Sequence, residues 1–224
     1  MRIMKVLITA GGTREPIDEV RYITNFSTGK TGAGLADIFS ENQWEVSYLC
    51  SLGAITPKHS VDLVEFSTFA DLHNILKRKL SEEFYDAIIH ASAVSDYRVD
   101  KIITDHEVWD GACPQKISSE CELTIKLKKN PKIISFLKEY SLNKKIKIIG
   151  FKLTNTLDET LRLQKIKKMS EYPGVDLVVH NDMNDLINGK RIFTIFQNMN
   201  LVGSVDSVAG LGTVLNLLLK KENL

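Results

Sequence analysis

The side chains best suited to bind an anion gather in one polar segment, residues 11–31, directly after the first apolar run of the chain. That run, residues 4–10, ends at a pair of glycines, as a buried parallel strand does where it enters a turn. A dinucleotide-binding fold makes this strand-to-helix turn in a few residues, which brings the helix N-terminus up to a pyrophosphate. Here the segment is far longer, and we interpret it as a nucleotide site enlarged to hold a second, acidic reactant. Its candidate ligand groups are Thr13, Arg14, Arg21, Asn25, Ser27, Thr28 and Lys30.

Two familiar nucleotide-binding motifs are approached in this chain but not completed. Gly29, Lys30 and Thr31 resemble the end of a P-loop, but Thr24 stands where the first glycine belongs and no strand immediately precedes the segment. The NAD-binding fingerprint is missing, because residues 10–13 lack its glycine spacing and the second expected strand ends without an acidic residue. The free N–H groups of a helix that starts near Lys30 still predict a phosphate site there.

Apolar runs that alternate with amphipathic stretches predict βαβ units, and therefore an α/β fold with a doubly wound, mostly parallel, Rossmann-like sheet. Residues 96–115 are predicted to be an irregular excursion, and residues 116–119 and 122–128 short antiparallel strands. A helix is expected to open at Asn130-Pro131, with proline at its first position. We expect one nucleotide-binding ligase domain over residues 1–224, with residues 96–127 as a small antiparallel flap or dimerisation excursion. The other expected strands are residues 46–50, 61–66, 87–93, 147–151, 175–179, 191–197 and 201–205, and the expected helices are residues 32–42, 69–80, 157–170 and 208–221.

Composition restricts the class of protein. The 224 residues carry 43% hydrophobic and 25% charged side chains, which are ordinary values for a globular chain. A formal net charge of +1 gives no reason to expect a nucleic-acid partner. Three cysteines without paired spacing indicate reduced thiols, and neither a secretory leader nor an apolar run of membrane-spanning length is recognisable. We therefore expect a cytoplasmic protein that acts on small molecules and not on membranes.

The residues that follow the expected strands form the second group of candidates, because ligands of open parallel sheets bind beyond the carboxyl ends of the strands. Asp96 and Asp182 could hold Mg²⁺ through water or accept from ribose hydroxyls, but no spacing identifies the metal ligands. The histidines lack metal-ligand spacing, and we interpret His90 and His180, at strand ends, as buried hydrogen-bonded groups. The expected nucleotide-binding residues are Gly11, Gly12, Thr13, Ser27, Thr28, Gly29, Lys30, Ala93, Val94, Ser95, Asp96, Gly150, Phe151, Lys152, Asn181 and Asp182.

Taken together, these motifs resemble those of the phosphopantothenate–cysteine ligase (phosphopantothenoylcysteine synthetase) family. Residues 7–36, then ASAVSDY, KISS, a helix led by Asn-Pro, GFK, a lysine-rich helix and HND follow one another in the family's order over essentially the whole chain. The resemblance implies a ligase of coenzyme A biosynthesis that joins phosphopantothenate to cysteine through an acyl-nucleotide. CTP, or ATP as in the eukaryotic type, would be the co-substrate with Mg²⁺, and pyrophosphate and a nucleoside monophosphate would be released.

The same resemblance implies an assembly. Family members are typically homodimers in which a partner segment closes the site, and the excursion at residues 96–127 is the expected contributor. Because the chain starts at the first strand, it resembles the stand-alone bacterial form of the enzyme. A functional link to a separate flavin-dependent decarboxylase is then expected, since the two activities are often fused.

Roles for individual residues also follow from the resemblance. Asn25 matches the asparagine that contacts the reacting acyl group, where an amide can donate to the carbonyl oxygen without neutralising the nucleophile. Arg21 and Lys116 fall at substrate-binding positions, although Arg21 is equally suited to pair with Asp18.

The family's catalytic lysine lies on the helix after GFK, and two positions compete for it. Counting forward from Gly150 gives Lys165, whereas counting back from the HND motif gives Lys168, and residues three apart share one helix face. Lys152 departs from the alanine of many bacterial members, and Thr154 replaces a common acidic residue. Both departures leave the preference for CTP or ATP open.

Two other functions are compatible with a Rossmann-like sheet. An NAD(P)-dependent oxidoreductase would need a Tyr-x-x-x-Lys pair, which Tyr97 and Lys101 match only in spacing. A non-catalytic nucleotide-binding module would not need the intact Asn25, Lys165 and Lys168.

Overall fold

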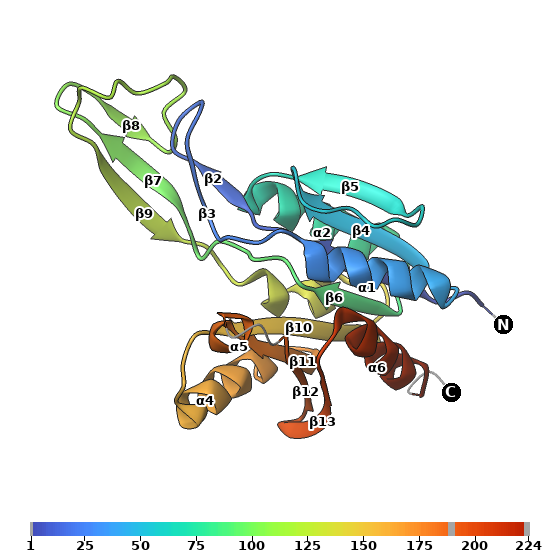
Figure 1. Ribbon diagram of the computed structural model, residues 1–224. Helices are drawn as coiled ribbons and strands as arrows, with labels where there is room; N and C mark the ends of the chain where they lie inside the picture. The colour runs from blue at the N-terminus through green and yellow to red at the C-terminus, as the bar shows by residue number, and fades with distance from the viewer. Residues whose placement is uncertain (1, 188–190, 222–224) are drawn as a thin grey trace.

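A twisted sheet of eight strands forms the centre of the molecule in the computed structural model, which describes residues 2–187 and 191–221 (Figure 1). Six neighbouring strands are parallel and stand in the order β5-β4-β1-β6-β10-β11, and β12 and β13 extend the sheet as an antiparallel edge. Counted along the chain, the parallel strands are ordered 3-2-1-4-5-6, the order of a doubly wound dinucleotide-binding sheet. The predicted fold class is confirmed. The strands are β1 (Lys5–Ala10), β4 (Glu45–Ser51), β5 (Asp62–Phe66), β6 (Ala87–His90), β10 (Lys147–Thr154), β11 (Val175–Asp182), β12 (Phe193–Gln197) and β13 (Asn200–Val205).

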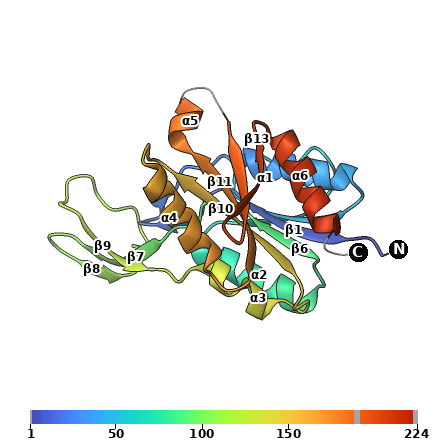
Figure 2. The same cartoon turned by 90° about the horizontal axis from the view of Figure 1, so that it is seen from below.

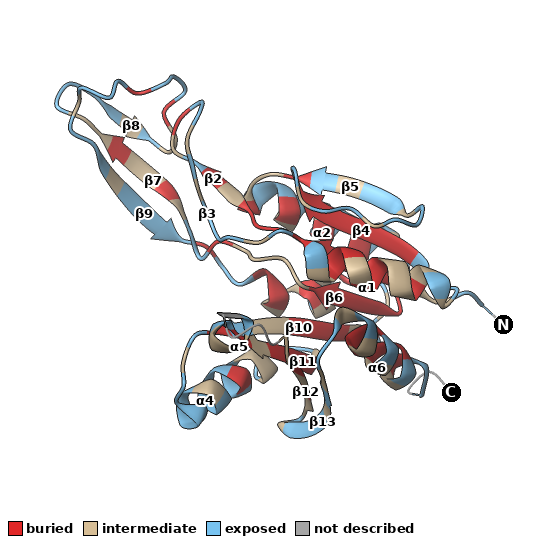
Figure 3. Cartoon of the chain, in the orientation of Figure 1, coloured by how far each residue is buried: buried red, intermediate tan, exposed pale blue. Residues whose placement is uncertain are grey.

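Helices cover both faces of this sheet, as Figure 2 shows from below. Alternation along β1 sends Val6 and Ile8 into a core with α1 and α6, whereas Leu7 packs with α2 and α3 on the other face. The buried strands lie between these two helical layers (Figure 3). None of the helices in the described ranges has the length and apolar composition to cross a membrane. The helices are α1 (Lys30–Glu41), α2 (Phe69–Glu82), α3 (Leu137–Tyr140), α4 (Glu159–Ser170), α5 (Met183–Ile187) and α6 (Val208–Lys221).

A three-stranded antiparallel sheet projects from the main body (Figure 1). Its strands are β7 (Tyr97–Ile103), β8 (Val108–Asp110) and β9 (Thr124–Lys129), with β7 in the middle. A short hairpin of β2 (Arg14–Pro16) and β3 (Tyr22–Thr24) lies against it, because Ile17 and Ile23 pack on the small core around Ile102. The long loop after β1 is therefore tied to the projecting sheet.

Three local predictions were wrong. Residues 96–115 are not irregular but contain β7 and β8, and the bulge between Val99 and Lys101 explains why no period-two pattern was visible. Residues 116–119 form a loop instead of a strand. Pro131 precedes the helical segment, which begins as a 3-10 turn, η1 (Ile133–Ser135), before α3.

Two glycines test whether a steric clash adds to the cost of a positive φ in the turn after β1. Gly11 and Gly111 both have a positive φ, of 81° and 87°. A Cβ on Gly11 would lie 2.1 Å from Oγ of Ser51, whereas one on Gly111 would meet nothing within 4 Å. We expect Gly111→Ala to lower the free energy of unfolding by about 1 kcal/mol, and Gly11→Ala to lower it by roughly 1–3 kcal/mol more because of the clash. Equal losses in urea denaturation would contradict this account.

Candidate functional site

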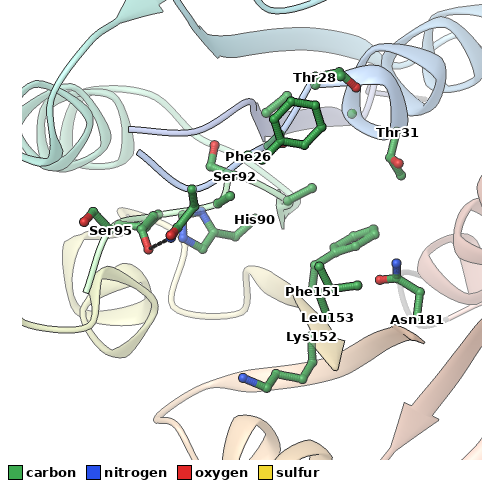
Figure 4. Close-up of a pocket in the computed structure, with 18 of the residues that line it drawn as sticks. Phe26, Thr28, Thr31, His90, Ser92, Ser95, Phe151, Lys152, Leu153 and Asn181 are labelled. Carbon is green, nitrogen blue, oxygen red and sulfur yellow. Dashed lines mark hydrogen bonds between the residues drawn. The ribbon is translucent and has the colours of Figure 1, made fainter. Parts of the chain in front are cut away.

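A cavity of about 800 Å³ opens at the carboxyl ends of β1, β6 and β10 (Figure 4). It lies where the strand order reverses between β1 and β6, the switch point at which parallel sheets bind ligands. Residues 24–32 form one wall, and residues 90–96 and 131–134 form others. Residues 151–153 of β10 and Asn181 also line it, together with residues such as Met169, Arg191 and Phe193. The volume is within the range that accommodates small-molecule ligands and cofactors.

The amino end of α1 faces this cavity and is suited to an anion. Gly29 precedes the helix in the left-handed conformation, no side chain caps the helix start in the described structure, and the first turn holds no acidic residue. Lys30 lines the cavity together with Arg191, whose guanidinium donates to Oγ1 of Thr31 at 2.6 Å. Free N–H groups and two cations therefore converge at one end of the cavity.

The loop that carries Asn25 is fixed by backbone contacts beneath it. The Asn25 side-chain amide donates to the carbonyl of Val94 at 3.2 Å. A Cβ on Gly12 would lie 2.4 Å from the Asn25 carbonyl oxygen, and the Thr13 hydroxyl accepts from the Ser95 amide at 2.9 Å. Gly12 and Thr13 thus hold two walls of the cavity together.

A second group of cations lies on the other face of β10. Phe151 packs in the core under α1, and its neighbour Lys152 points to the opposite face (Figure 4). Burial lowers the pKa of Lys152, and the positive charges of Lys132, Lys165 and Lys168 lower it further. Lys165 and Lys168 are exposed on α4 and outside the cavity lining, but they lie near enough for their charges to act on Lys152.

Asp96 is the only carboxylate in the described lining of the cavity, and it forms an ion pair with Lys132. Among residues 2–187 and 191–221, no group of three or more His, Cys, Asp or Glu side chains is arranged to hold a metal ion. A divalent cation at this site would therefore need ligand oxygens from a bound phosphate as well as from Asp96.

Asp182 lies behind the cavity. Burial would raise its pKa, but hydrogen bonds from Thr154 and Asn184 outweigh this effect and hold the pKa far below the usual carboxyl range. Asp182 also lies 3.6 Å from Nε of Arg162 on α4. Its carboxylate thus anchors the amino-terminal part of the helix that carries Lys165.

Arg21 pairs with Asp18 in the structure, which is one of the two roles that the sequence left open for it. Asp18 accepts from Arg21 at 2.7 Å and from the amide of Ile117 at 3.1 Å, and Arg21 donates to the Ile117 carbonyl at 2.5 Å. Burial opposes ionisation of Asp18, but hydrogen bonds from Val20, Ile117 and Arg21 lower its pKa to about 2. Lys116 is exposed beside Ile117. A role for Arg21 and Lys116 toward substrate stays a prediction.

The cavity unites residues that are distant in the sequence. The expected site residues that line it are Asn25, Ser27, Thr28, Gly29, Lys30, Ala93, Val94, Ser95, Asp96, Phe151, Lys152 and Asn181. The expected site residues outside its described lining are Gly11, Gly12, Thr13, Arg21, Lys116, Gly150, Lys165, Lys168 and Asp182. Lining residues that the sequence did not single out for the site include Phe26, Thr31, His90, Ser92, Lys132 and Arg191.

The sequence held signals for some of these missed residues. Lys132 directly follows the Asn-Pro motif, and His90 ends an expected strand, which is where sites of this fold gather. Arg191 had no local signal, because only the pairing of β12 with β11 brings it to the start of α1.

Tyr97 and Lys101 do not form a dehydrogenase pair. Both lie on β7, where residues four apart are separated by roughly 13 Å, and Lys101 pairs with Asp110 at 3.1 Å.

Comparisons with known proteins identify the family of the chain. A family model described as the DNA/pantothenate metabolism flavoprotein C-terminal domain matches residues 1–203. The coenzyme A biosynthesis bifunctional protein CoaBC of Thermococcus kodakarensis is 34% identical over 179 residues, which cover 80% of this chain and 41% of that protein. The protein of the same name from Methanocaldococcus jannaschii is 34% identical over 180 residues, with the same shares covered.

The fold is shared with a solved structure over nearly its full length. The DNA/pantothenate metabolism flavoprotein from Streptococcus pneumoniae superposes with a TM-score of 0.85 at 26% identity, covering 98% of this chain and 99% of that one. In contrast, the chain spans about two fifths of the length of the curated relatives it matches.

The buried His90 provides a test of the cavity's electrostatics. Burial lowers the pKa of His90 from 6.5 to about 4, so the ring stays neutral until the pH falls well below 6.5. We expect the His90 ring resonances in NMR spectra to keep their positions between pH 8 and pH 6. The His90 signal is assigned as the one that is absent from the spectrum of His90→Gln. A titration midpoint near pH 6.5 for that signal would contradict a pKa lowered by burial.

Proposed function

The chain belongs to the family of the DNA/pantothenate metabolism flavoprotein C-terminal domain, and from this premise we propose that it is a phosphopantothenate–cysteine ligase of coenzyme A biosynthesis. The observation that carries the proposal is one cavity with cations from both faces of the sheet: Lys30 and Arg191 at α1, and Lys132 and Lys152 beyond β10. Such a site can bring together two anions, an acid and a nucleoside triphosphate, that repel each other in solution. The names of the curated relatives also support a role in coenzyme A biosynthesis.

The proposed reaction has two steps. A carboxylate oxygen of phosphopantothenate attacks the α-phosphorus of the nucleotide, the bond to the β-phosphate oxygen breaks, and pyrophosphate leaves. The amine of cysteine then attacks the acyl carbon, the bond to the nucleotide phosphate breaks, and the nucleoside monophosphate leaves while the amine loses a proton. The first step gives a poor electrophile a leaving group.

The residues of the chain divide this work. The Asn25 amide lies on the cavity wall, where it can exchange its bond to Val94 for one to the acyl oxygen. The amino end of α1, with Lys30 and Arg191, holds phosphate oxygens. Lys165 or Lys168 stabilises the negative charge that develops at the α-phosphate, after α4 or the ligand moves to close the remaining distance.

CTP is the proposed co-substrate, with ATP as the alternative. Mg²⁺ would neutralise phosphate charge when bound, and Asp96 is the residue placed to hold it together with the phosphates. Lys152 is half-buried in the cavity lining, and its ammonium adds a charge that bears on nucleotide choice. Initial rates with CTP and ATP at equal concentration decide between the two.

A second copy of the chain is the proposed partner. The projecting sheet and the β2–β3 hairpin expose large apolar side chains, including Tyr22, Val108 and Leu127. A homodimer that covers them would place this sheet beside the partner's cavity. The product carries a cysteine carboxylate, and a flavin-dependent decarboxylase is the proposed consumer.

Asn25 gives the most direct test of the reaction. We expect the wild-type chain to release pyrophosphate only when nucleotide, phosphopantothenate and cysteine are supplied, with phosphopantothenoylcysteine detected by mass spectrometry. Asn25→Asp should abolish ligation, because a carboxylate replaces the amide donor and repels the acid. Asn200→Asp, on the exposed strand β13, is the matched control and should keep its rate. Near-normal turnover by Asn25→Asp would eliminate the assigned role.

The lysine assignment is tested on α4. We expect Lys165→Gln or Lys168→Gln to lower kcat by at least about 100-fold, the scale of one positioned charged donor. Lys167→Gln, which removes an equally exposed cation from another face of the helix, should change kcat by less than about threefold. If both Lys165→Gln and Lys168→Gln remain fully active, the charge on α4 plays no part in the reaction.

A further inference from the structure

His90 is a buried polar residue that the proposed reaction has not yet used. Only 8% of its surface is exposed, yet it lines the cavity (Figure 4). It ends β6, and its pairing partners are Thr9 of β1 and Gly150 of β10. The residue therefore stands at the point where the strand order of the sheet reverses.

Hydrogen bonds around Thr9 determine which ring nitrogen carries the proton. The Thr9 hydroxyl accepts from the amide of Ser92 at 3.2 Å and lies 2.9 Å from Nδ1 of His90. A hydroxyl has a single proton to donate, and Nδ1 is the one acceptor found for it in the described structure. When Thr9 donates to Nδ1, both the hydroxyl proton and the Nδ1 lone pair have a partner, and the neutral ring then carries its proton on Nε2.

The Nε2–H group is the free end of this arrangement. No residue in the described part of the chain forms a hydrogen bond with Nε2, and the ring borders the cavity. Nε2 is not among the buried side-chain atoms that lack a partner in the described structure, so it is accessible from the cavity, and a ligand bound there can accept from it. Because Nε2 carries the proton, the face toward the ligand has no lone pair, which excludes a role as general base or metal ligand in this tautomer.

Cations lie on the same face of the sheet as the His90 ring. Ala10 packs against α1, but alternation along the strands turns Thr9 and His90 to the opposite face, the one that packs with α2 and α3. Lys152 follows Gly150, the β10 partner of His90, by two residues and therefore occupies this face, and Lys132 also lines the cavity. A neutral donor there can orient a phosphoryl group without adding to the charges of Lys132 and Lys152.

We propose that His90 is a ligand-binding residue whose Nε2–H donates a hydrogen bond to a phosphoryl oxygen of the nucleotide held at the switch point. This inference rests on the proposed function for the identity of the nucleotide. Thr9 acts as the positioning residue, since its hydroxyl fixes the tautomer.

Three variants separate the donor from the shape of the ring. We expect His90→Leu to lower kcat/KM for CTP by about 10- to 100-fold, the value of one hydrogen bond to a charged acceptor. His90→Gln keeps an N–H donor, so its decrease in log(kcat/KM) should be at least one third smaller than that of His90→Leu. His73→Gln, which changes a histidine bonded to Tyr140 away from the cavity, is the matched control and should retain the wild-type value.

A measurement on the wild-type chain decides the matter without turnover and without a folding risk. In ¹⁵N spectra, His90 should show a protonated Nε2 and an unprotonated Nδ1, and the Nε2 signal should move when CTP alone is added. A shift with CTP in a chain that makes no phosphopantothenoylcysteine would retain this inference and reject the ligase function. An unmoved Nε2 signal at saturating CTP, or His90→Leu with wild-type kcat/KM, would overturn the inference while leaving the ligase function standing.

Discussion

Close packing between the first strand and the first helix is the constraint on which the cavity depends. Gly32 leaves room for Ala10, and Gly12 leaves room for the backbone at Asn25, with 2.5 Å and 2.4 Å to an added Cβ. Since nothing larger than hydrogen fits at either position, the helix starts directly beside the strand end and the loop folds back over it. Residues 25–30 are consequently held at the cavity by backbone contacts, not by long side chains that would fill the space.

The carboxylates around the site already have partners, so the cavity offers a ligand mainly positive charge. Asp18 is paired with Arg21, Asp182 with Thr154, Asn184 and Arg162, and the exposed Asp96 with Lys132. The cavity therefore offers a ligand mainly cations and N–H donors. An arrangement of this kind favours anionic reactants before any step of chemistry, because their charge is not opposed by free carboxylates.

The sequence was sufficient for those features that depend on local periodicity. The parallel strands, the four longer helices and the edge strands β12 and β13 follow from runs such as residues 87–93 and 208–221. The order of the strands, which puts the switch point between β1 and β6, is given by the structure. β7 was missed because a bulge leaves its buried residues Val99 and Ile102 three positions apart, which hides the alternation. Arg191 was missed because a contact between residues 160 positions apart leaves no trace in a local pattern.

The site prediction succeeded for residues that reach the cavity because a strand ends there. It was incomplete where the direction of a side chain determines whether a residue lines the cavity. Segments after β6 and β10 were expected at the site, and residues 93–96 and 151–152 line the cavity. Gly150, one position earlier in β10, contributes no described lining, and Asp182 turns into a buried network with Thr154. Gly150 shares a face with Lys152 but has no side chain to reach the cavity, whereas Asp182 lies on the opposite face of β11 from Asn181.

The loop over β1 and the projecting sheet form one mechanical unit. Asp18 pairs with Arg21 within the loop and accepts from the Ile117 amide, and Arg21 donates to the Ile117 carbonyl, so two hydrogen bonds join the loop to the projecting segment beside a small apolar core. Any displacement of the sheet, for instance when a second copy binds it, must then be transmitted along β3 to Thr24 and Asn25. Arg21 therefore influences the position of the Asn25 side chain through the backbone, and this effect does not require its guanidinium to reach a ligand.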